Sequence, residues 1–271
     1  MTIIVALLFV ITVSQASCFE KYLEVPKDCG GGTNMRETWR RDAVEQHNWK
    51  RLDLANGIPF KDRRDITYPT ASDMNALYYD CELEHEAYEI AKKCHNGGPD
   101  FDYVGSNNET LRHDGYPPDF GFVNSIVDKW WETALENGDL VDLKPSEKNR
   151  PMIPFLQIVD KWWKTALEDG DLVDLKPSEK NRPMIPFLQM ANGGTNKIGC
   201  AYHECHDENY NPSEHGEEYP YHYGQKSYLL FVCRYGEPHI KVGSPIYTEG
   251  PQCDSCKDRC IQKALCDTEI A

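Results

Sequence analysis

Residues Phe187–Cys205 read FLQMANGGTNKIGCAYHEC, and the second half of this segment has the composition of a β-strand. Lys197–Tyr202 is apolar and rich in β-forming residues, and so is Ser227–Tyr235, SYLLFVCRY. The residues between these two runs are polar and rich in His and Glu, which is typical of a loop. Two strands separated by a loop predict an antiparallel sheet in this half of the chain.

The residues before this segment predict helices. Met35–Ala55 has apolar residues near helical spacing, and Asn56-Gly57 supplies a stop. Asp73 is a candidate cap for a second helix, whose apolar stripe runs through Met74–Cys94. Gly97–Phe122 is rich in Gly, Pro, Asn and Asp and is expected to be a long loop. Helices followed by an antiparallel sheet predict an α+β layer architecture.

A stretch of 32 residues occurs twice in succession. IVDKWWETALENGDLVDLKPSEKNRPMIPFLQ at 126–157 is repeated at 158–189, and only two pairs of positions differ, Glu132/Lys164 and Asn137/Asp169. Repeat architectures usually contain about three or more units, which have diverged from one another. Two near-identical copies therefore indicate a recent tandem duplication or a misjoined exon.

Each copy carries a pair of tryptophans, Trp130-Trp131 in the first and Trp162-Trp163 in the second. A packed Trp buries about 150 to 250 Å², and an exposed pair would form an adhesive patch. We expect one of the two WW helices to fill a core position. Because the copies share every apolar residue, the sequence leaves open which one does.

The N-terminal segment 1–17, MTIIVALLFVITVSQAS, has the order of a secretory signal peptide, an apolar run followed by small residues. A membrane anchor needs roughly 18 to 20 apolar residues, and this run is shorter. Eleven cysteines fit an oxidising compartment. Their odd number means that one thiol stays free or pairs between chains, and Cys18, beside the cleavage site, is the cysteine expected to be lost or left over. These features predict a secreted, extracellular protein.

Charge and motifs exclude several classes of function. A net charge of −15 disfavours nucleic acid and anionic membranes as partners. Asn108-Glu109-Thr110 is an N-glycosylation sequon, which predicts a glycoprotein with Asn108 glycosylated in a surface loop. HECH at His203–His206 lacks the second His of the HExxH metalloprotease motif, and no nucleophile elbow, phosphate loop or dinucleotide fingerprint occurs. The acidic cluster Glu82-Glu84-Glu86 is expected to be a solvated face.

Four ordered segments resemble the CAP superfamily, which includes cysteine-rich secretory proteins, venom allergens and plant pathogenesis-related proteins. The segments are HNWKRLDLANG at His47–Gly57, MNALYYDCELEHEAYEIAKKC at Met74–Cys94, FLQMANGGTNKIGCAYHEC at Phe187–Cys205 and FVCRYGEPHIKVGSPIYTEGPQC at Phe231–Cys253. Within the family, YDCELE with AKKC, and PIYTEGPQC before a short tail, resemble the activation-associated secreted proteins, or venom-allergen-like proteins, of parasitic nematodes. The resemblance implies an α-β-α sandwich with an antiparallel sheet between helices.

The resemblance also implies a domain division and a set of disulfides. After the signal peptide at 1–17 it implies a CAP domain at 35–236, which contains the duplication at 126–157 and 158–189, and a Cys-rich C-terminal extension at 237–271. One WW copy is then surplus to the fold. Bridges are implied among Cys94, Cys200, Cys205 and Cys233, and within the tail among Cys253, Cys256, Cys260 and Cys266. Of Cys18, Cys29 and Cys81, one is left without a partner.

Many CAP domains hold a divalent metal with two His and two Glu in a central cavity. At the corresponding positions this chain has Gly98 for the first His, with His95 nearby, and SNNETL for the Gly-Glu-Asn turn, whose only acid is Glu109. The second Glu is replaced by Thr133 or Thr165, and the second His by Pro186. We therefore predict no tetrad metal site, no cofactor and no catalysis.

The function that the resemblance implies is that of a secreted, non-enzymatic protein of a parasitic nematode, which binds a host or other extracellular protein. A sterol or lipid carrier is the alternative from a second class, and a secreted protease is a third. The expected partners include no nucleic acid, and no membrane insertion is expected.

Overall fold

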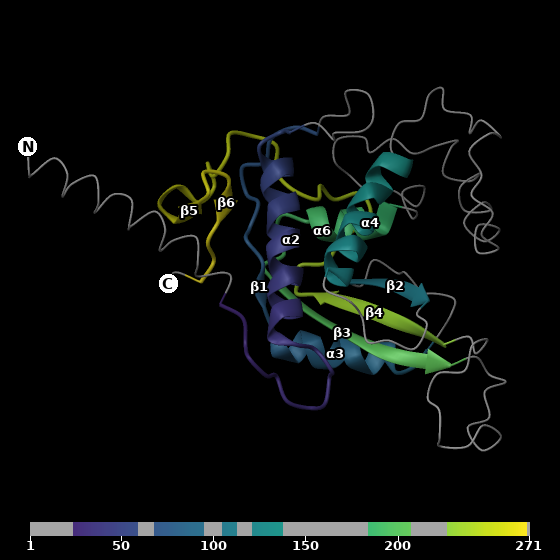
Figure 1. The fold of residues 1–271 in the computed structure, drawn as a ribbon. Helices are drawn as coiled ribbons and strands as arrows, with labels where there is room; N and C mark the ends of the chain where they lie inside the picture. Colours follow the sequence, from purple (N-terminus) through teal and green to yellow (C-terminus); the bar gives the residue numbers. More distant parts are fainter. Residues whose placement is uncertain are drawn as a thin grey trace, which may run out of the picture.

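The computed structural model describes residues 24–58, 68–94, 105–112, 121–137, 184–206 and 227–269. A four-stranded sheet with the order β1-β3-β4-β2 lies at the centre of this part of the chain (Figure 1). Its strands are β1 (Tyr78–Tyr79), β2 (Ser106–Arg112), β3 (Lys197–His206) and β4 (Ser227–Tyr235). Within the described residues, no helix combines the length and the apolar composition needed to cross a membrane.

Helices cover both faces of the sheet. On one face lie α2 (Glu37–Ala55), α4 (Phe122–Asn137) and α6 (Ile185–Ala191), which pack against one another, and on the other face lies α3 (Cys81–Ala91) (Figure 1). Trp39, Trp130, Phe187 and Phe231 belong to one continuous buried core. The predicted α-β-α sandwich is confirmed.

The sheet is mixed, which corrects the expected all-antiparallel arrangement. β3 and β4 pair antiparallel from Ile198↔Tyr235 to His206↔Ser227, and β2 pairs antiparallel with β4. β1 pairs in parallel with β3. A strand of two residues is too short to show the alternating pattern from which strands are predicted, so its direction could not be expected.

The second helix begins later than predicted. Asp80, and not Asp73, is its N-cap: the Asp80 carboxylate accepts hydrogen bonds from the backbone N–H of Glu82 at 2.9 Å and of Leu83 at 3.1 Å. Met74 and Leu77 are fully buried, but they lie before the helix, in a segment that includes β1. The apolar stripe was real, and its first part belongs to extended chain.

Strand β2 lies inside the segment that was expected to be a loop. SNNETLR at Ser106–Arg112 contains residues that are rare in strands, and its pairing with β4 overrides this low propensity. Asn108 pairs with Val232 and Glu109 with Phe231. Gly97–Phe122 is therefore not one loop, and the Asn108 sequon lies on a sheet strand.

The first copy of the repeat supplies the WW helix. In α4, Trp130 is 1% exposed and Trp131 is 6% exposed. Trp130 stacks on Phe231 with ring centroids 5.9 Å apart, and Trp131 meets the edge of Phe187 at 4.9 Å. Phe187 lies in α6, which is formed by the end of the second copy. The rest of the second copy, 158–183, lies outside the described residues.

The C-terminal extension packs onto the sandwich. It contains a short 3₁₀ helix, η6 (Lys257–Arg259), and the paired strands β5 (Cys260–Ile261) and β6 (Leu265–Cys266). Backbone hydrogen bonds join Cys266 to Met74 and to Ala76. Ile261 and Leu265 belong to the main core. The extension therefore shares the core of the sandwich instead of forming a separate unit.

A glycine in β3 allows α3 to lie directly against the sheet. A Cβ atom at Gly199 would be 2.2 Å from the backbone nitrogen of Glu84 and 2.5 Å from the carbonyl oxygen of Asp80. No other residue fits at this distance without moving the helix. This close contact places the first turn of α3 beneath the sheet and brings Glu84 into the interior.

Candidate functional site

A chain of hydrogen bonds crosses the interior between α2, β4, β2 and α6, and we call it the central polar chain. The His47 ring bonds the Ala43 carbonyl through Nδ1 at 2.7 Å and the Tyr235 hydroxyl through Nε2 at 2.8 Å. Asn107 Nδ2 donates to the Tyr235 oxygen at 3.0 Å and to the Pro186 carbonyl at 2.9 Å. A carbonyl can only accept, so Nδ1 carries the proton and Tyr235 donates to Nε2.

Burial keeps the central polar chain in one protonation state. The pKa of His47 is lowered to about 3, chiefly by burial. The Ala43 hydrogen bond opposes this effect, and the Arg51 charge adds to it. Burial also raises the pKa of Tyr235. Neither group exchanges a proton near neutral pH, so both serve as structural hydrogen-bonding groups.

His47 should make the protein sensitive to acid. In the unfolded chain its imidazole binds a proton below about pH 6.5, whereas in the folded protein it does so only near pH 3. The unfolded state binds more protons in this window, so stability present above pH 6.5 is lost as the pH falls towards 3. At pH 5 the loss from this residue is about 2 kcal/mol.

This contribution is measured by urea unfolding between pH 7 and pH 4.5. The matched variant is His47→Gln, whose amide can still donate to the Ala43 carbonyl and accept from Tyr235 but does not titrate. We expect the stability of the variant to fall less steeply with acid. Parallel pH profiles of the two proteins would contradict the assignment.

The structure describes some of the positions that the resemblance associates with metal binding. The side chains of Thr133 and Glu109, at two of these positions, make contacts within the fold. Thr133 Oγ1 donates to the Trp130 carbonyl at 2.7 Å and accepts from the Phe187 backbone N–H at 3.2 Å, which joins α4 to α6. Glu109 forms an ion pair with Lys129 at 2.8 Å. His95, Gly98 and Thr165 lie outside the described residues. The absence of a tetrad metal site therefore stays a prediction.

Two other groups of potential ligands have structural roles. Among the described residues, Cys253, Cys256 and Cys266 are close enough to one another to suggest a metal site, but all three are in disulfides. The HECH segment lies within β3, which extends to His206. There the ring of His203 meets the edge of Tyr88 at 5.9 Å, and Cys205 is in a disulfide. A strand does not provide the helical spacing of a metalloprotease motif.

Five disulfides join the described segments. The eight cysteines named from the resemblance form the bridges Cys94–Cys205, Cys200–Cys233, Cys253–Cys260 and Cys256–Cys266. The fifth bridge, Cys29–Cys81, joins the N-terminal arm, which we define as residues 24–34, to the start of α3. The sequence left this pair open among three cysteines, and the third, Cys18, lies outside the described residues.

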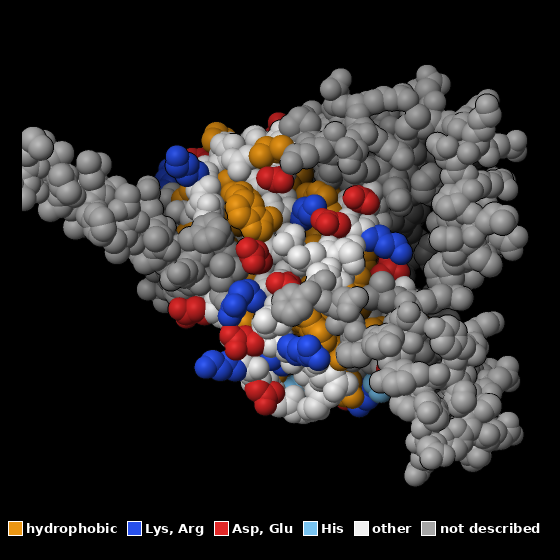
Figure 2. All heavy atoms as spheres, in the orientation of Figure 1, with side chains coloured by type: hydrophobic (Ala, Val, Ile, Leu, Met, Phe, Trp, Pro, Cys, Tyr) orange, Lys and Arg blue, Asp and Glu red, His pale blue; other side chains and the backbone are white. Residues whose placement is uncertain are grey.

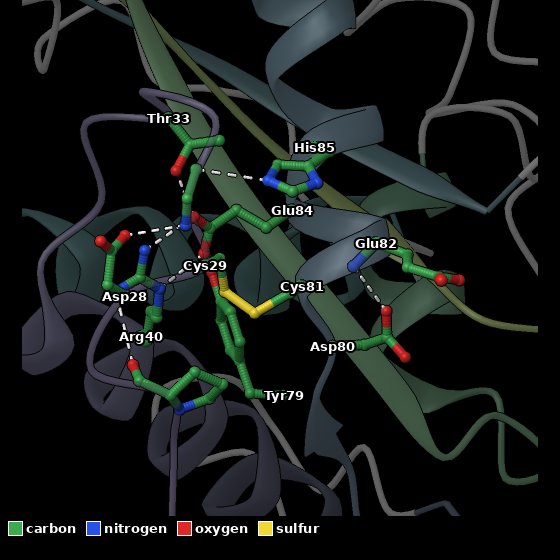
Figure 3. Close-up of a disulfide and its surroundings, with 12 residues drawn as sticks. Asp28, Cys29, Thr33, Arg40, Tyr79, Asp80, Cys81, Glu82, Glu84 and His85 are labelled. Carbon is green, nitrogen blue, oxygen red and sulfur yellow. Dashed lines mark hydrogen bonds and ion pairs between the residues drawn. A yellow bond between two sulfur atoms is a disulfide. The ribbon is translucent and has the colours of Figure 1, made fainter.

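Next to the Cys29–Cys81 bridge is a buried group of charged and polar side chains, which we call the ion-pair cluster (Figure 3). Arg40 Nε lies 2.6 Å from Glu84 Oε2, and Arg40 Nη2 lies 2.7 Å from Glu84 Oε1. The hydroxyl of Tyr79 donates to Glu84 at 2.6 Å, and the hydroxyl of Thr33 donates to its other oxygen. Glu84 is fully buried, so its assignment to a solvated face was wrong.

The ion-pair cluster holds the N-terminal arm against the sandwich. Arg40 also donates to the carbonyls of Lys27, at 2.9 Å, and Pro26, at 3.4 Å. Its bond to Glu84 raises the pKa of Arg40, and burial raises the pKa of Tyr79. The guanidinium therefore stays charged and the phenol stays neutral. The cluster joins the arm, α2 and α3 without offering a proton for chemistry.

A second buried arginine holds the turn between α6 and β3. Arg51 is 0% exposed, and its guanidinium donates to five carbonyl groups, those of Asn75, Met190, Asn192, Gly193 and Thr195. Burial lowers the pKa of Arg51 to about 9, which still leaves it charged at neutral pH. We call this arrangement the carbonyl cage.

A pocket of about 310 Å³ opens between the end of α6 and the segment that follows β4. Pro238, Ile240 and Tyr247 line it together with the polar residues Asp73 and Lys241. The Asp73 carboxylate accepts from Thr248 N–H at 2.8 Å and from Thr248 Oγ1 at 2.6 Å. The pocket is at the small end of the usual range for ligand sites, about 300 to 1,000 Å³.

The Asn108 sequon faces the interior of the fold. Asn108 Nδ2, the atom to which a glycan would be attached, is buried and has no hydrogen-bond partner. The Asn108 carbonyl accepts from Trp130 Nε1 at 3.1 Å. A glycan at this atom would require the buried surroundings of the Asn108 side chain to open.

We therefore expect Asn108 to be unmodified in protein secreted from eukaryotic cells. The measurement is peptide mass spectrometry after treatment with peptide N-glycosidase, which converts a glycosylated Asn to Asp. The matched control is the Thr110→Ala variant, in which the sequon is destroyed. Conversion of Asn108 to Asp in the parent protein but not in this variant would show that the site is used.

Comparison with known proteins supports the resemblance. A model of the cysteine-rich secretory protein family, CAP, matches residues 44–235. The Ancylostoma secreted protein of Ancylostoma caninum is 24% identical over 242 residues, which are 86% of this chain and 44% of that protein. The chain therefore spans less than half the length of this curated relative.

Solved structures share the fold. Na-ASP-1 matches with a TM-score of 0.56 and 23% identity, over 90% of this chain and 51% of that one. NaASP2 with Zn²⁺ matches with a TM-score of 0.58 and 22% identity, over 88% of this chain and 100% of that one. BmVAL-1 matches with a TM-score of 0.56 and 21% identity, over 90% of this chain and 100% of that one. The sandwich, its disulfides and the family match lead to one conclusion: the chain belongs to the CAP family of cysteine-rich secretory proteins.

Proposed function

We propose that this chain is a secreted, non-enzymatic CAP protein, and that its exterior binds a host protein outside the cell. The observation that carries the proposal is the state of the buried ionisable groups. His47 is fixed in the central polar chain, Glu84 is paired with Arg40, and Arg51 is held by five carbonyls. Groups that are fully engaged with the fold in this way stabilise it and are poorly placed to act on a substrate.

Secretion is supported by the leader-like segment 1–17 and by the disulfides. Five bridges among the described residues are typical of a protein that folds in an oxidising compartment. A relative carries the name secreted protein. Together these observations favour a location outside the cell.

The charge of the chain indicates the kind of partner. A net charge of −15 favours proteins with basic surfaces and gives their association an electrostatic component. On the face shown in Figure 2, acidic side chains lie beside basic and apolar ones over the described part of the surface. Such a mixed surface suits a polar protein interface in which salt affects the association rate.

Binding is tested with the mature protein, residues 18–271, immobilised on a sensor surface. Purified host extracellular proteins, basic and acidic, are passed over it one at a time. The proposal expects saturable binding of at least one basic protein, with an association rate that falls as the salt concentration rises. If no member of the panel binds saturably, the proposal of a host-protein partner fails.

The competing proposal of a protease is tested separately. The chain is incubated with casein in the presence and absence of a chelator, and its melting temperature is recorded with and without Zn²⁺, the ion held by the related NaASP2 structure. We expect no cleavage and no zinc-dependent rise in melting temperature. Cleavage that the chelator abolishes would identify a metalloenzyme and overturn the non-enzymatic proposal.

The second candidate function is that of a lipid or sterol carrier, and the pocket beside Tyr247 is the observation in its favour. Its volume of about 310 Å³ is at the lower limit for small-molecule sites, which makes a sterol the less favoured ligand. Titrations with a fluorescent fatty acid and with a fluorescent sterol test this alternative. Saturable binding that a Tyr247→Trp variant weakens would favour the carrier.

A further inference from the structure

Helix α4 covers a surface that includes Lys50, Glu109, Phe187 and Phe231, which we call the α4 place. A small set of contacts binds the WW helix to this surface. Trp130 stacks on Phe231 and Trp131 meets Phe187. Two ion pairs lie at the edge of the contact, Lys50 with Asp128 at 2.6 Å and Lys129 with Glu109 at 2.8 Å. These contacts fix both the depth and the direction of the helix.

Every one of these helix residues occurs again in the second copy. Seven residues of α4 within the repeat are buried or form a hydrogen bond or ion pair. Identical residues occur 32 positions later in the second copy, at Ile158, Val159, Asp160, Lys161, Trp162, Trp163 and Thr165. One of the two differences, Glu132 against Lys164, is at an exposed position of α4. The α4 place therefore meets the same side chains whichever copy it binds.

The connections allow either copy to reach the α4 place. The end of the second copy forms most of α6, which leads through the 192–196 turn into β3, so α6 is the same in both arrangements. If the second copy supplied the WW helix, residues 170–183 would join it to α6. Fully extended, this segment spans about 45 Å, which is ample because α4 and α6 are in contact. The surplus residues would then precede the helix instead of following it.

Residues outside the repeat favour the first copy. Phe122 and Val123 belong to α4 but precede the duplication, and Val123 is fully buried. Phe122 meets Trp39 at 4.9 Å and Phe231 at 5.6 Å. The second copy has Pro154 and Phe155 at these positions. It therefore keeps the WW contacts but loses the fit of this first turn.

We propose that the two copies compete for the α4 place within one chain, with the first copy bound in most molecules and the second in a minority. Exchange moves 32 surplus residues from one side of the helix to the other. A tethered competitor acts at an effective concentration in the millimolar range for short flexible linkers, so exchange within a chain is favoured over exchange between chains.

The ion pairs provide a direct measurement in the intact protein. A carbodiimide joins a Lys to an Asp or Glu that it contacts, without a spacer. The first copy gives Lys50–Asp128 and Lys129–Glu109 products, and the second gives Lys50–Asp160 and Lys161–Glu109 products. Trypsin releases Asp128 and Asp160 in peptides of different sequence, so mass spectrometry separates them. In the monomer we expect both sets, with the Asp128 product in excess, and absence of the Asp160 product contradicts the proposal.

Two matched variants show whether the copies are interchangeable. In W130A/W131A we expect the protein to remain folded and the ratio of Lys50–Asp160 to Lys50–Asp128 product to rise at least tenfold. In W162A/W163A we expect the Asp160 product to disappear while the Asp128 product is unchanged. A chain from which residues 158–189 are deleted has one copy, and W130A/W131A should prevent it from folding.

The proposal is overturned if W130A/W131A unfolds the two-copy chain as completely as it unfolds the one-copy chain. It is also overturned if the Asp160 and Lys161 products occur only in covalent dimers, because the second copy would then bind a neighbouring molecule. Retained folding together with Asp160 products in the monomer supports it.

Discussion

Replacing Glu84 with Gln is expected to lower the free energy of unfolding by about 3 to 5 kcal/mol, since it leaves a buried charge without its partner. Arg40 is 1% exposed and receives both of its carboxylate contacts from Glu84. A neutral amide cannot balance the guanidinium, and the low-dielectric surroundings make the remaining charge costly. The Tyr79 hydroxyl keeps an acceptor in this variant, the Cys200 carbonyl at 3.0 Å. Most of the lost stability therefore comes from the unpaired Arg40 guanidinium.

The measurement is urea unfolding at neutral pH with the disulfides intact. Glu86→Gln is the matched control, because Glu86 is in the same helix, pairs with Arg234 and is 54% exposed. We expect that control to change stability by less than about 1 kcal/mol. The double variant Arg40→Met, Glu84→Leu should regain most of the stability lost, since it removes both charges.

If Glu84→Gln costs no more than Glu86→Gln, the ion-pair cluster is not an energetic clamp. The position of the arm supplies a second readout. Cleavage after Lys27 by trypsin should accelerate in Glu84→Gln, because the Lys27 carbonyl is held by Arg40. The Cys29–Cys81 bridge remains in every variant, so faster cleavage reports loss of the cluster and not loss of the covalent tether.

A helix or strand could be predicted where the residues that determine it lie within its own segment of sequence. Helix α2 has its apolar residues and its stop within one segment, and its bounds agree with the expectation to within about two residues. Strand β4 is an unbroken β-rich run and was expected at its observed position. β1 and β2 were missed because their conformation depends on pairing with β3 and β4, which lie far away in the chain.

The choice between the WW copies also depends on contacts outside the local pattern. The buried and paired helix residues are the same in both copies. Phe122 and Val123, which lie before the repeat, add contacts to the first copy only. A comparison limited to the repeat could not have found this difference.

The candidate site was less predictable than the fold. The cysteines could be named because their positions follow a family pattern. Glu84 lies between Glu82 and Glu86, and this run has the appearance of an exposed acidic face. Its burial depends on Gly199, which lets the helix touch the sheet. Arg40 and Arg51 belong to a helix rich in charged residues, and nothing in their spacing distinguishes them from the exposed Arg41.

The buried charged groups make the stability of the fold sensitive to single substitutions. Among them, we expect substitution of Arg51 in the carbonyl cage to lower the free energy of unfolding most. Replacing Arg51 with Met is expected to lower the free energy of unfolding by about 5 kcal/mol or more, because each unsatisfied buried carbonyl costs about 1 to 3 kcal/mol. That is comparable to the whole stability of a typical domain, about 5 to 15 kcal/mol. Arg51→Lys should cost less, about 3 kcal/mol, since an ammonium retains three donors for five acceptors.

Arg41→Met is the matched control for these variants, because Arg41 is in the same helix, is 44% exposed and pairs with Glu37. A change of less than about 0.5 kcal/mol is expected for it. The three variants are compared by urea unfolding, and native-state hydrogen exchange of the 192–196 turn supplies a local readout, since Arg51 holds the carbonyls of Asn192, Gly193 and Thr195. Exchange in this turn should accelerate in the order Arg41→Met, Arg51→Lys, Arg51→Met. Equal exchange in all three would mean that the turn is held by its other contacts, such as the hydrogen bond of the Asn192 side chain to the Pro238 carbonyl at 2.6 Å, and that the guanidinium is dispensable.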